Sequence, residues 1–266
     1  MFEDFYGFAQ TPFCRTIPTD KLYRGNDSDE LIDRLKWAAK RQLFAVMTGD
    51  SGTGKTTILR RFNDELQNTQ YRVLYLADSK MTPVTFYKSI LKQLGFEAKH
   101  VRCEAKRRLH KEIEIMKGIH GILPVVIVDE GHLLDREMLE EIRFLLNYRM
   151  DSESPMSLIL SGQSELWENL RLQSYAAIHQ RIDVKCGVGH MDRAQTAEYI
   201  KTHLDYAGCQ KDIFSDAAID DIFQFSSGIP RLINKACTSF LLYGAQNKKT
   251  IIDDRMAKLV IECELS

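Results

Sequence analysis

The sequence predicts an α/β fold in two parts: a five-stranded, mostly parallel sheet with helices on both faces, and a C-terminal helical lid. Strand-like apolar runs and helix-like segments alternate up to about residue 186, as they do in a parallel sheet with crossover helices. From about residue 190 only helical patterns remain. We therefore place a core domain over residues 1–188 and the lid over residues 189–266.

Five apolar runs in the core predict strands, and five amphipathic segments predict helices. The run that precedes two acids at 129 and 130 is continuously apolar, as in a strand buried on both faces. The expected strands are residues 43–48, 71–77, 124–129, 156–161 and 182–186. The expected helices are residues 28–41, 55–68, 82–94, 104–119 and 136–149.

Four helices are expected in the lid. Asp192 and Ser215 stand before the first two and are favourable N-cap residues. Gln195, three residues after Asp192, approaches a capping box. The lid helices are expected at residues 192–206, 215–226, 229–246 and 253–264, with breaks at Gly208 and at Gly228-Ile229-Pro230.

Composition sets mild bounds. With 266 residues, 44% of them hydrophobic, the chain can bury an α/β core and one smaller unit. Its net charge of −1 gives no overall basic field, so nucleic-acid binding would need a local basic patch. The six cysteines form no C-x2-C pair, which argues against a zinc site and a disulfide framework. Without a signal peptide or a membrane-length apolar stretch, we expect a cytoplasmic protein with no membrane contact.

Residues 49–56 match the pattern G-x4-G-K-[ST], directly after the first apolar run and at the start of a helix. In such a loop the glycines let backbone N–H groups point at a β-phosphate, and Lys55 reaches the β- and γ-phosphate oxygens. The Thr56 hydroxyl is placed to bind Mg²⁺, and the helix N-terminus attracts anions. The sequence therefore predicts an ATP and Mg²⁺ site formed by Gly49, Asp50, Ser51, Gly52, Thr53, Gly54, Lys55, Thr56 and Thr57.

Asp129 and Glu130 follow the third predicted strand, at the carboxyl end where open α/β sheets bind ligands. Two acids at this place alone would also fit a solvated turn or a helix cap. Together with the phosphate loop they indicate hydrolysis, with Asp129 holding Mg²⁺ through water and Glu130 polarising the attacking water. We expect an ATP hydrolase.

Five further motifs are Phe5-Tyr6-Gly7-Phe8, Thr11-Pro12-Phe13, Asp129-Glu130, Leu160-Ser161-Gly162-Gln163 and Ser227-Gly228-Ile229-Pro230-Arg231-Leu232-Ile233-Asn234. With these motifs the chain resembles, over essentially its whole length, the AAA+ ATPases, and within them the ExeA type. That group includes a secretion ATPase and is similar to the transposition ATPases TnsC, TniB and MuB.

The resemblance implies further polar groups around the phosphates. Gln163 would be sensor 1, with Ser161 as its substitute, and the alternative is an ordinary loop amide. Arg231 would be sensor 2, reaching from the lid to the γ-phosphate so that ATP binding closes the lid. Arg181, or as second choice Arg171, would be the arginine finger given to a neighbouring subunit. A surface arginine is the alternative for each arginine.

The resemblance also places the adenine base against the N-terminal segment, with Phe13 and Tyr23 in contact with it. Aromatic residues in such a segment can instead simply pack on the core. His132 gives the pattern Asp-Glu-x-His, which is found in helicases, but the rest of the helicase pattern is not evident.

Residues 99–117 hold seven Lys or Arg residues and three acids, a local basic excess. Helices at this place line the central channel in rings that resemble this protein, so Lys106, Arg107 and Arg108 would contact DNA phosphates without reading sequence. Lys80, after the second strand, would join them. The alternative is a solvated face whose charges pair with Glu112 and Glu114.

These observations predict an AAA+ ATPase that forms a homo-oligomeric ring or helical filament on double-stranded DNA and recruits or activates a transposase. An ExeA-like ATPase for secretion or envelope assembly is the alternative. We disfavour it because the similar secretion proteins carry a membrane anchor and a further domain after the lid, whereas this sequence ends at Ser266. A nucleotide-switched scaffold that recruits proteins with little turnover is the third hypothesis, against which the Asp129-Glu130 pair argues.

Overall fold

A computed structural model describes residues 2–66, 70–78, 81–97, 101–147 and 153–265. The chain divides into two compact units. We call them the sheet unit, Asp27–Ser51 and Lys55–Val188, and the helical unit, Met1–Asn26, Gly52–Gly54 and Gly189–Ser266. Each unit is described by itself.

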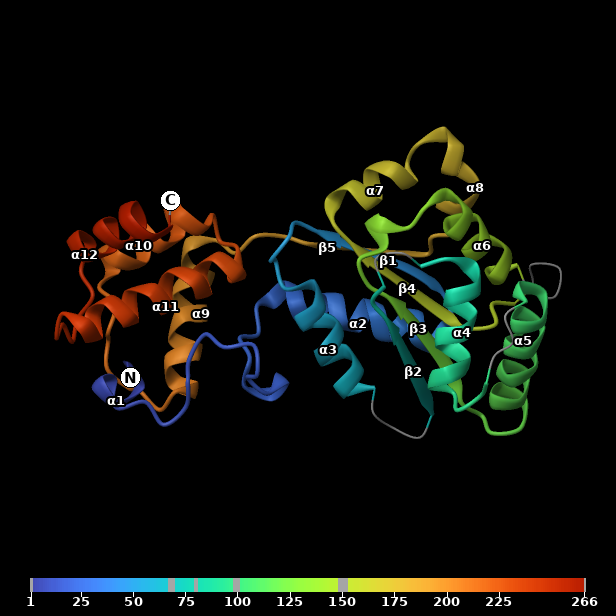
Figure 1. Ribbon diagram of the computed structural model, residues 1–266, viewed down its shortest axis with the longest axis horizontal. Helices are drawn as coiled ribbons and strands as arrows, with labels where there is room; N and C mark the ends of the chain where they lie inside the picture. Colours follow the sequence, from blue (N-terminus) through green and yellow to red (C-terminus); the bar gives the residue numbers. More distant parts are fainter. Residues whose placement is uncertain (1, 67–69, 79–80, 98–100, 148–152, 266) are drawn as a thin grey trace. The chain divides into compact units, whose positions relative to one another are not determined.

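The sheet unit is built on five strands in the order β2-β3-β4-β1-β5, and every neighbouring pair is parallel (Figure 1). The strands are β1 Phe44–Gly49, β2 Tyr71–Leu76, β3 Leu123–Val128, β4 Ser157–Gly162 and β5 Val184–Val188. The central strands β1 and β4 are buried at every residue, whereas the edge strands β2 and β5 are partly exposed. The predicted α/β fold is confirmed, and each strand lies within two residues of its predicted bounds.

Successive side chains of each strand point to opposite faces of the sheet, and a hydrophobic core lies on each face. In β3, Val126 and Val128 belong to one core and Val125 and Ile127 to the other. Helices α4 Pro83–Gln93, α5 Arg102–Gly118 and α6 Arg136–Leu146 supply the first core, and α2 Asn26–Arg41 and α3 Lys55–Glu65 supply the second. Burial on both faces explains why the strands are continuous apolar runs rather than alternating ones.

Short helices complete the sheet unit and were not expected from the sequence. They are α7 Ser164–Leu170 and α8 Ala176–His179, with 3-10 turns at Gly131–Leu133 and Gln173–Tyr175. Leu166, Leu170 and Ile178 anchor α7 and α8 to the first core. Segments of four to seven residues are too short to show a helical period, so the sequence pattern did not reveal them.

The helical unit consists of α1 Phe2–Tyr6, a 3-10 turn at Thr19–Lys21, α9 Arg193–Tyr206, α10 Asp216–Ser226, α11 Pro230–Gln246 and α12 Asp254–Val260, followed by a π-turn at Ile261–Leu265. Asp192 and Gln195 form the full capping box at the start of α9, and Ser215 accepts a hydrogen bond from the Ala218 backbone at the start of α10. The predicted caps are confirmed. Among the described helices, none has both the length and the apolar character needed to cross a bilayer.

The N-terminal segment packs with the C-terminal helices. Phe2 and Phe13 are buried in the same apolar cluster as Ile200, Ile233 and Phe240, and the Tyr6 hydroxyl donates to the Lys249 carbonyl oxygen at 2.9 Å. The grouping differs here from the sequence-based division, which placed residues 1–26 with the core. A run of aromatic residues indicates burial but does not say which apolar surface covers it. The roles of the two parts as nucleotide-binding core and lid stay a prediction.

Candidate nucleotide-binding site

The phosphate loop connects the carboxyl end of β1 to the first residue of α3. Gly52 and Gly54 have φ angles of +89° and +99°, a conformation that residues with a Cβ rarely adopt. The backbone path therefore requires glycine at 54, a fixed position of the motif, and at 52, one of its variable positions. Thr53 between them is buried.

Lys55, the first residue of α3, is directed back at the loop. Its Nζ donates to the carbonyl oxygens of Gly49 and Asp50, both at 2.8 Å, and the residue is only 9% exposed. A phosphate oxygen forms a stronger, charge-assisted bond with an ammonium than a neutral carbonyl does. The side chain is thus held beside the loop in a position from which it can exchange these partners for a phosphate.

Asp129 accepts three hydrogen bonds from three different elements. Thr56 Oγ1 donates to its Oδ2 at 3.0 Å, Tyr75 Oη donates to the same oxygen at 2.9 Å, and the Glu130 N–H donates to Oδ1 at 2.9 Å. The acid is 3% exposed. The Asp129 carboxylate, directly after β3, and the Thr56 hydroxyl of α3 form a pair of hard oxygen donors, which is the chemistry that Mg²⁺ selects. This donor set fits the predicted metal.

Tyr75 is a site residue that the sequence analysis missed. It lies on β2, beside β3 in the sheet and paired in register with Ile127. Burial, and then the hydrogen bond to the Asp129 carboxylate, raise the pKa of Tyr75 well above its usual value. The phenol therefore stays protonated and remains a donor to Asp129. A tyrosine near the end of a strand is the signal that would have identified it, once the strand order was known.

Glu130 occupies a left-handed backbone conformation, with φ at 55° and ψ at 32°. Its side chain is 52% exposed, and its Oε2 lies 3.6 Å from His132 Nδ1. A non-glycine residue in this conformation costs of order 1 kcal/mol, and such residues gather at functional sites. The strained turn separates the two acids, so that Asp129 is buried against Thr56 while the Glu130 carboxylate reaches solvent.

Gln163 stands just beyond β4, at the N-cap of α7, and its Nε2 lies 3.0 Å from His132 Nε2. The next residue, Ser164, donates from Oγ to Asp50 Oδ1 of the phosphate loop at 2.8 Å. Ser161 is fully buried, and its hydroxyl has no hydrogen-bond partner among the described residues. Gln163 therefore lies next to His132, and the residue after it contacts the loop, whereas Ser161 is buried.

Arg181 and Arg171 lie in the segment between α7 and β5. Arg181 lines a shallow cavity with Arg41, Phe44 and Asp183, at the amino ends of β1 and β5. The phosphate loop leaves β1 at its opposite, carboxyl end, about 15 Å away for a strand of this length. Arg181 is therefore far from the phosphate loop of the same chain. Arg171 caps the end of α7 and is exposed.

The remaining predicted nucleotide contacts belong to the helical unit. Arg231 is the exposed second residue of α11, after Pro230 at its first turn. The Phe13 ring stacks on His203 with centroids 5.0 Å apart and is 6% exposed, so little of it is open to a nucleotide base. Tyr23 is half-buried and donates to Glu198 at 3.2 Å. The contacts of Arg231, Phe13 and Tyr23 with ATP stay predictions.

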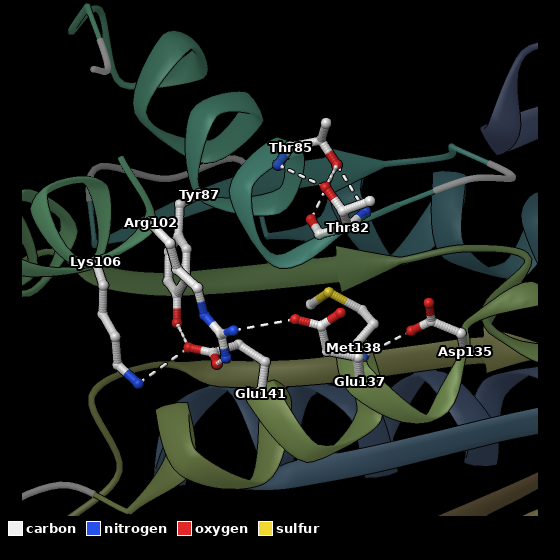
Figure 2. Close-up of polar contacts among 9 residues, drawn as sticks. All are labelled: Thr82, Thr85, Tyr87, Arg102, Lys106, Asp135, Glu137, Met138 and Glu141. Carbon is white, nitrogen blue, oxygen red and sulfur yellow. Dashed lines mark hydrogen bonds and ion pairs between the residues drawn. The ribbon is translucent and has the colours of Figure 1, made fainter. Parts of the chain in front are cut away.

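The basic helix α5 is held by a buried acid on α6. Glu141 is 2% exposed, and its Oε1 lies 3.0 Å from Lys106 Nζ. Figure 2 shows it in contact with Tyr87, Arg102 and Lys106. Burial opposes the charge of Glu141, but the hydrogen bonds from these three side chains hold its pKa below the usual value. The carboxylate is therefore ionised and ties α4, α5 and α6 together.

The three predicted DNA contacts of α5 differ in what they touch. Lys106 is paired with Glu141, and Arg108 pairs with Glu112 at 2.8 Å while lying over the Phe96 ring. Arg107 is exposed and makes no ion pair with a described residue. The fourth, Lys80, lies outside the described residues. An external anion would compete with internal acids for Lys106 and Arg108, so Arg107 is the most accessible of these three cations to a ligand in solution.

Strand order and loop chemistry define the class of protein. The strand β4 lies between β1, which leads into the phosphate loop, and β3, which the acid pair follows; this order with this loop describes an AAA+ P-loop ATPase. The chain belongs to the family described as "AAA domain", which matches residues 38–170.

Two relatives narrow the position within that class. The chain is 28% identical over 245 residues to General secretion pathway protein A of Aeromonas hydrophila, covering 91% of this chain and 44% of that protein. It is 23% identical over 165 residues to ATP-dependent target DNA activator B of Escherichia phage Mu, covering 60% and 49%. The chain spans about half the length of the relatives it matches. The expected relation to the ExeA type and to MuB is confirmed.

Among solved structures, Cdc6p from Pyrobaculum aerophilum matches with a TM-score of 0.69 at 15% identity, covering 90% of this chain and 67% of that one. At this level of identity the match supports the fold alone.

Proposed function

We propose that this chain binds ATP with Mg²⁺ at the carboxyl ends of β1 and β3 and hydrolyses it. The observation that carries the proposal is the contact between the Thr56 hydroxyl and the Asp129 carboxylate, 3.0 Å apart, beside an inward-held Lys55. Phosphoryl transfer needs a cation at the phosphates and oxygen donors that hold a metal ion, and this site has both at the carboxyl ends of neighbouring parallel strands.

Each residue has a distinct task in that reaction. The loop N–H groups hold the β-phosphate, and Lys55 leaves the carbonyls of Gly49 and Asp50 for the phosphate oxygens. Thr56 and Asp129 hold Mg²⁺, which when bound neutralises charge on the phosphates. Glu130, exposed to solvent, orients the attacking water and takes its proton, while Gln163 contacts the γ-phosphate or that water.

Turnover on this scheme depends on assembly. Arg181 lies at the amino ends of the strands, whereas the phosphate loop of the same subunit lies at their carboxyl ends. This distance supports a role for Arg181 as the arginine finger in the site of a neighbouring copy. The helical unit would act as the lid, with Arg231 reaching the γ-phosphate. The chain would thus form an ATP-dependent ring or helical filament of identical subunits.

We further propose that this assembly forms in the cytoplasm on double-stranded DNA without reading its sequence, and recruits or activates a transposase. The relation to the phage Mu activator and the exposed Arg107 on a basic helix support this. The second candidate is a role in secretion or envelope assembly, which the longer match to General secretion pathway protein A favours.

ATP turnover and fluorescence-anisotropy binding to a random-sequence duplex test the proposal, with ATP, ADP or no nucleotide. We expect ATP-dependent DNA binding that weakens steeply with salt, and loss of ATP binding and turnover in Lys55→Ala. Arg107→Ala should weaken DNA binding more than Arg108→Ala, its neighbour already paired with Glu112. Turnover without DNA binding or stimulation at low salt would contradict the DNA role and favour the secretion candidate.

A further inference from the structure

We propose that Tyr75 is a positioning residue that makes the candidate metal site selective for Mg²⁺ over Ca²⁺, because its hydroxyl limits how the Asp129 carboxylate can bind a cation. The inference rests on the proposed binding of ATP with Mg²⁺. Tyr75 Oη and Thr56 Oγ1 both donate to Asp129 Oδ2, at 2.9 and 3.0 Å, while the Glu130 N–H donates to Oδ1 at 2.9 Å. The proposed reaction gives tasks to Thr56 and Asp129 but none to Tyr75.

The lone pairs of the Asp129 carboxylate determine how it can bind a cation. An ionised carboxylate has about four lone pairs, two on each oxygen. The bonds from Tyr75 and Thr56 occupy both on Oδ2, and the bond from Glu130 occupies one on Oδ1. Among the described residues no other donor reaches Asp129. One lone pair of Oδ1 is therefore left for a cation or for its bound water, and both oxygens can chelate a cation only if a hydrogen bond breaks.

The Tyr75 backbone is held on both sides although β2 is an edge strand. On one side Tyr75 is paired in register with Ile127 of β3. On the other side stands the side-chain amide of Gln93, the last residue of α4. The Tyr75 N–H donates to Gln93 Oε1 at 3.2 Å, and Gln93 Nε2 donates to the Tyr75 carbonyl oxygen at 2.9 Å. The amide thus takes the place of a further strand and fixes the residue that carries the phenol.

The hydroxyl is also a permanent donor. Burial, and then the bond to Asp129, raise the pKa of Tyr75, so the phenol keeps its proton at neutral pH. Asp129 itself is 3% exposed, so solvent does not readily replace the phenol at Oδ2. The restriction on the carboxylate is therefore present before any metal ion arrives.

Mg²⁺ and Ca²⁺ differ in what they need from a carboxylate. Mg²⁺ demands octahedral geometry and usually keeps several waters, whereas Ca²⁺ takes about six to eight oxygens and often binds a carboxylate through both of its oxygens. One open lone pair on Asp129 satisfies Mg²⁺ but denies Ca²⁺ the second oxygen. Tyr75 thereby disfavours Ca²⁺ without touching the metal.

Nucleotide binding in the presence of each ion tests the proposal. The Kd of a fluorescent ADP analogue is measured with MgCl2 or CaCl2 for wild type, Tyr75→Phe and Tyr71→Phe, the last as control on the same strand. We expect Tyr75→Phe to lower the ratio of the Ca²⁺ Kd to the Mg²⁺ Kd about tenfold, mainly through tighter binding with Ca²⁺. This factor is the lower end of what one hydrogen bond to a charged group contributes, since Tyr75 is 42% exposed. In Tyr71→Phe the ratio should equal that of wild type.

The ratio distinguishes this role from a merely structural one. A variant that is only less stable loses affinity for both complexes by the same factor, which leaves the ratio unchanged. An unchanged ratio in Tyr75→Phe, or an equal change in Tyr71→Phe, overturns the proposal. In steady-state assays, Ca²⁺ should also inhibit Mg²⁺-dependent turnover at an about tenfold lower concentration in Tyr75→Phe than in wild type.

Failure of the proposed function gives a different result. Wild-type protein that binds the nucleotide with either ion but does not hydrolyse ATP would contradict the proposed hydrolysis, and the Kd ratios would then decide the inference alone. Wild-type protein whose nucleotide binding does not depend on a metal ion would overturn both proposals.

Discussion

Asp129 accepts one hydrogen bond each from β2, α3 and its own turn, so a single buried carboxylate fixes the geometry of the site. Without those donors a carboxylate at 3% exposure would bear an uncompensated desolvation cost. These three hydrogen bonds explain how a buried acid can directly follow a strand that is wholly apolar.

Tyr75→Phe removes one of these donors and leaves the ring in place. We expect the free energy of unfolding to fall by about 1 kcal/mol, since a hydrogen bond to a charged group is worth about 1.5–3 kcal/mol and Tyr75 is partly exposed. Urea unfolding measures the loss, with Tyr71→Phe on the same strand as control. Equal stability of Tyr75→Phe and wild type would show that the phenol does not support Asp129.

Among the elements, α5 is attached to its neighbours by charge as well as by apolar packing. Leu109 and Ile113 are buried in the first core, while Arg102 and Lys106 reach across to Glu141 on α6. Part of the basic charge that predicted a DNA surface is therefore paired with an acid of the same chain. The position of α5 depends on the ionised state of one buried acid.

Glu141→Gln keeps the size of the side chain and removes its charge. We expect a loss of about 1–3 kcal/mol of unfolding free energy, below the usual cost of breaking a buried pair because Arg102 and Lys106 are partly exposed. Glu137→Gln is the matched control, on the same helix and facing the same Arg102; at an exposed pair it should change stability by less than about 1 kcal/mol. Equal effects in urea unfolding of the two variants would contradict the role given to Glu141.

Helix α9 carries a histidine whose burial makes the helical unit sensitive to acid. Burial lowers the pKa of His203 from 6.5 to about 4, and its Nδ1 accepts the Phe13 N–H at 3.1 Å. Between these two pKa values the unfolded chain binds the proton and the folded chain does not. Stability therefore falls as pH decreases from about 6.5 to 4, by up to about 1.4 kcal/mol per pH unit.

His203→Gln removes this titration. We expect its unfolding free energy to depend less on pH than that of the wild type across that window, measured by urea unfolding at pH 7, 6 and 5. His190→Gln, at an exposed histidine of the same unit, is the control. Parallel pH profiles for His203→Gln and wild type would refute the assignment.

At the scale of the whole molecule, the proposed role of Arg181 as an arginine finger would separate ATP binding from ATP turnover. Arg181→Ala should retain ATP binding and lose turnover by about 10³–10⁵-fold, as expected for an arginine finger. Mixing it with Lys55→Ala subunits should restore part of the activity, because each variant supplies what the other lacks. Steady-state ATPase assays of the separate and mixed variants measure this, with Arg171→Ala as comparison. No recovery on mixing, or full activity of Arg181→Ala alone, would contradict a finger supplied in trans.

The sequence predicted those parts of the fold and site whose signal is local. The apolar run of β3, the loop at residues 49–56 and the cap at Asp192 each carry their pattern within a few neighbouring residues. Tyr75 and His132 could not be assigned this way, because their partners Asp129 and Gln163 reach them only through strand order. The contact between Phe13 and His203, 190 residues apart in the sequence, likewise depends on the tertiary fold and not on a local pattern.

The packing of residues 1–26 against α9–α12 has a consequence for biosynthesis. The N-terminal segment is completed by helices that are translated after the sheet unit, whereas the sheet unit is nearly continuous between residues 27 and 188. Domains fold as units during synthesis, so the sheet unit can form while the N-terminal aromatic residues still wait for their partners. The apolar surface of those residues therefore stays uncovered while the sheet unit is being made, until α9–α12 emerge.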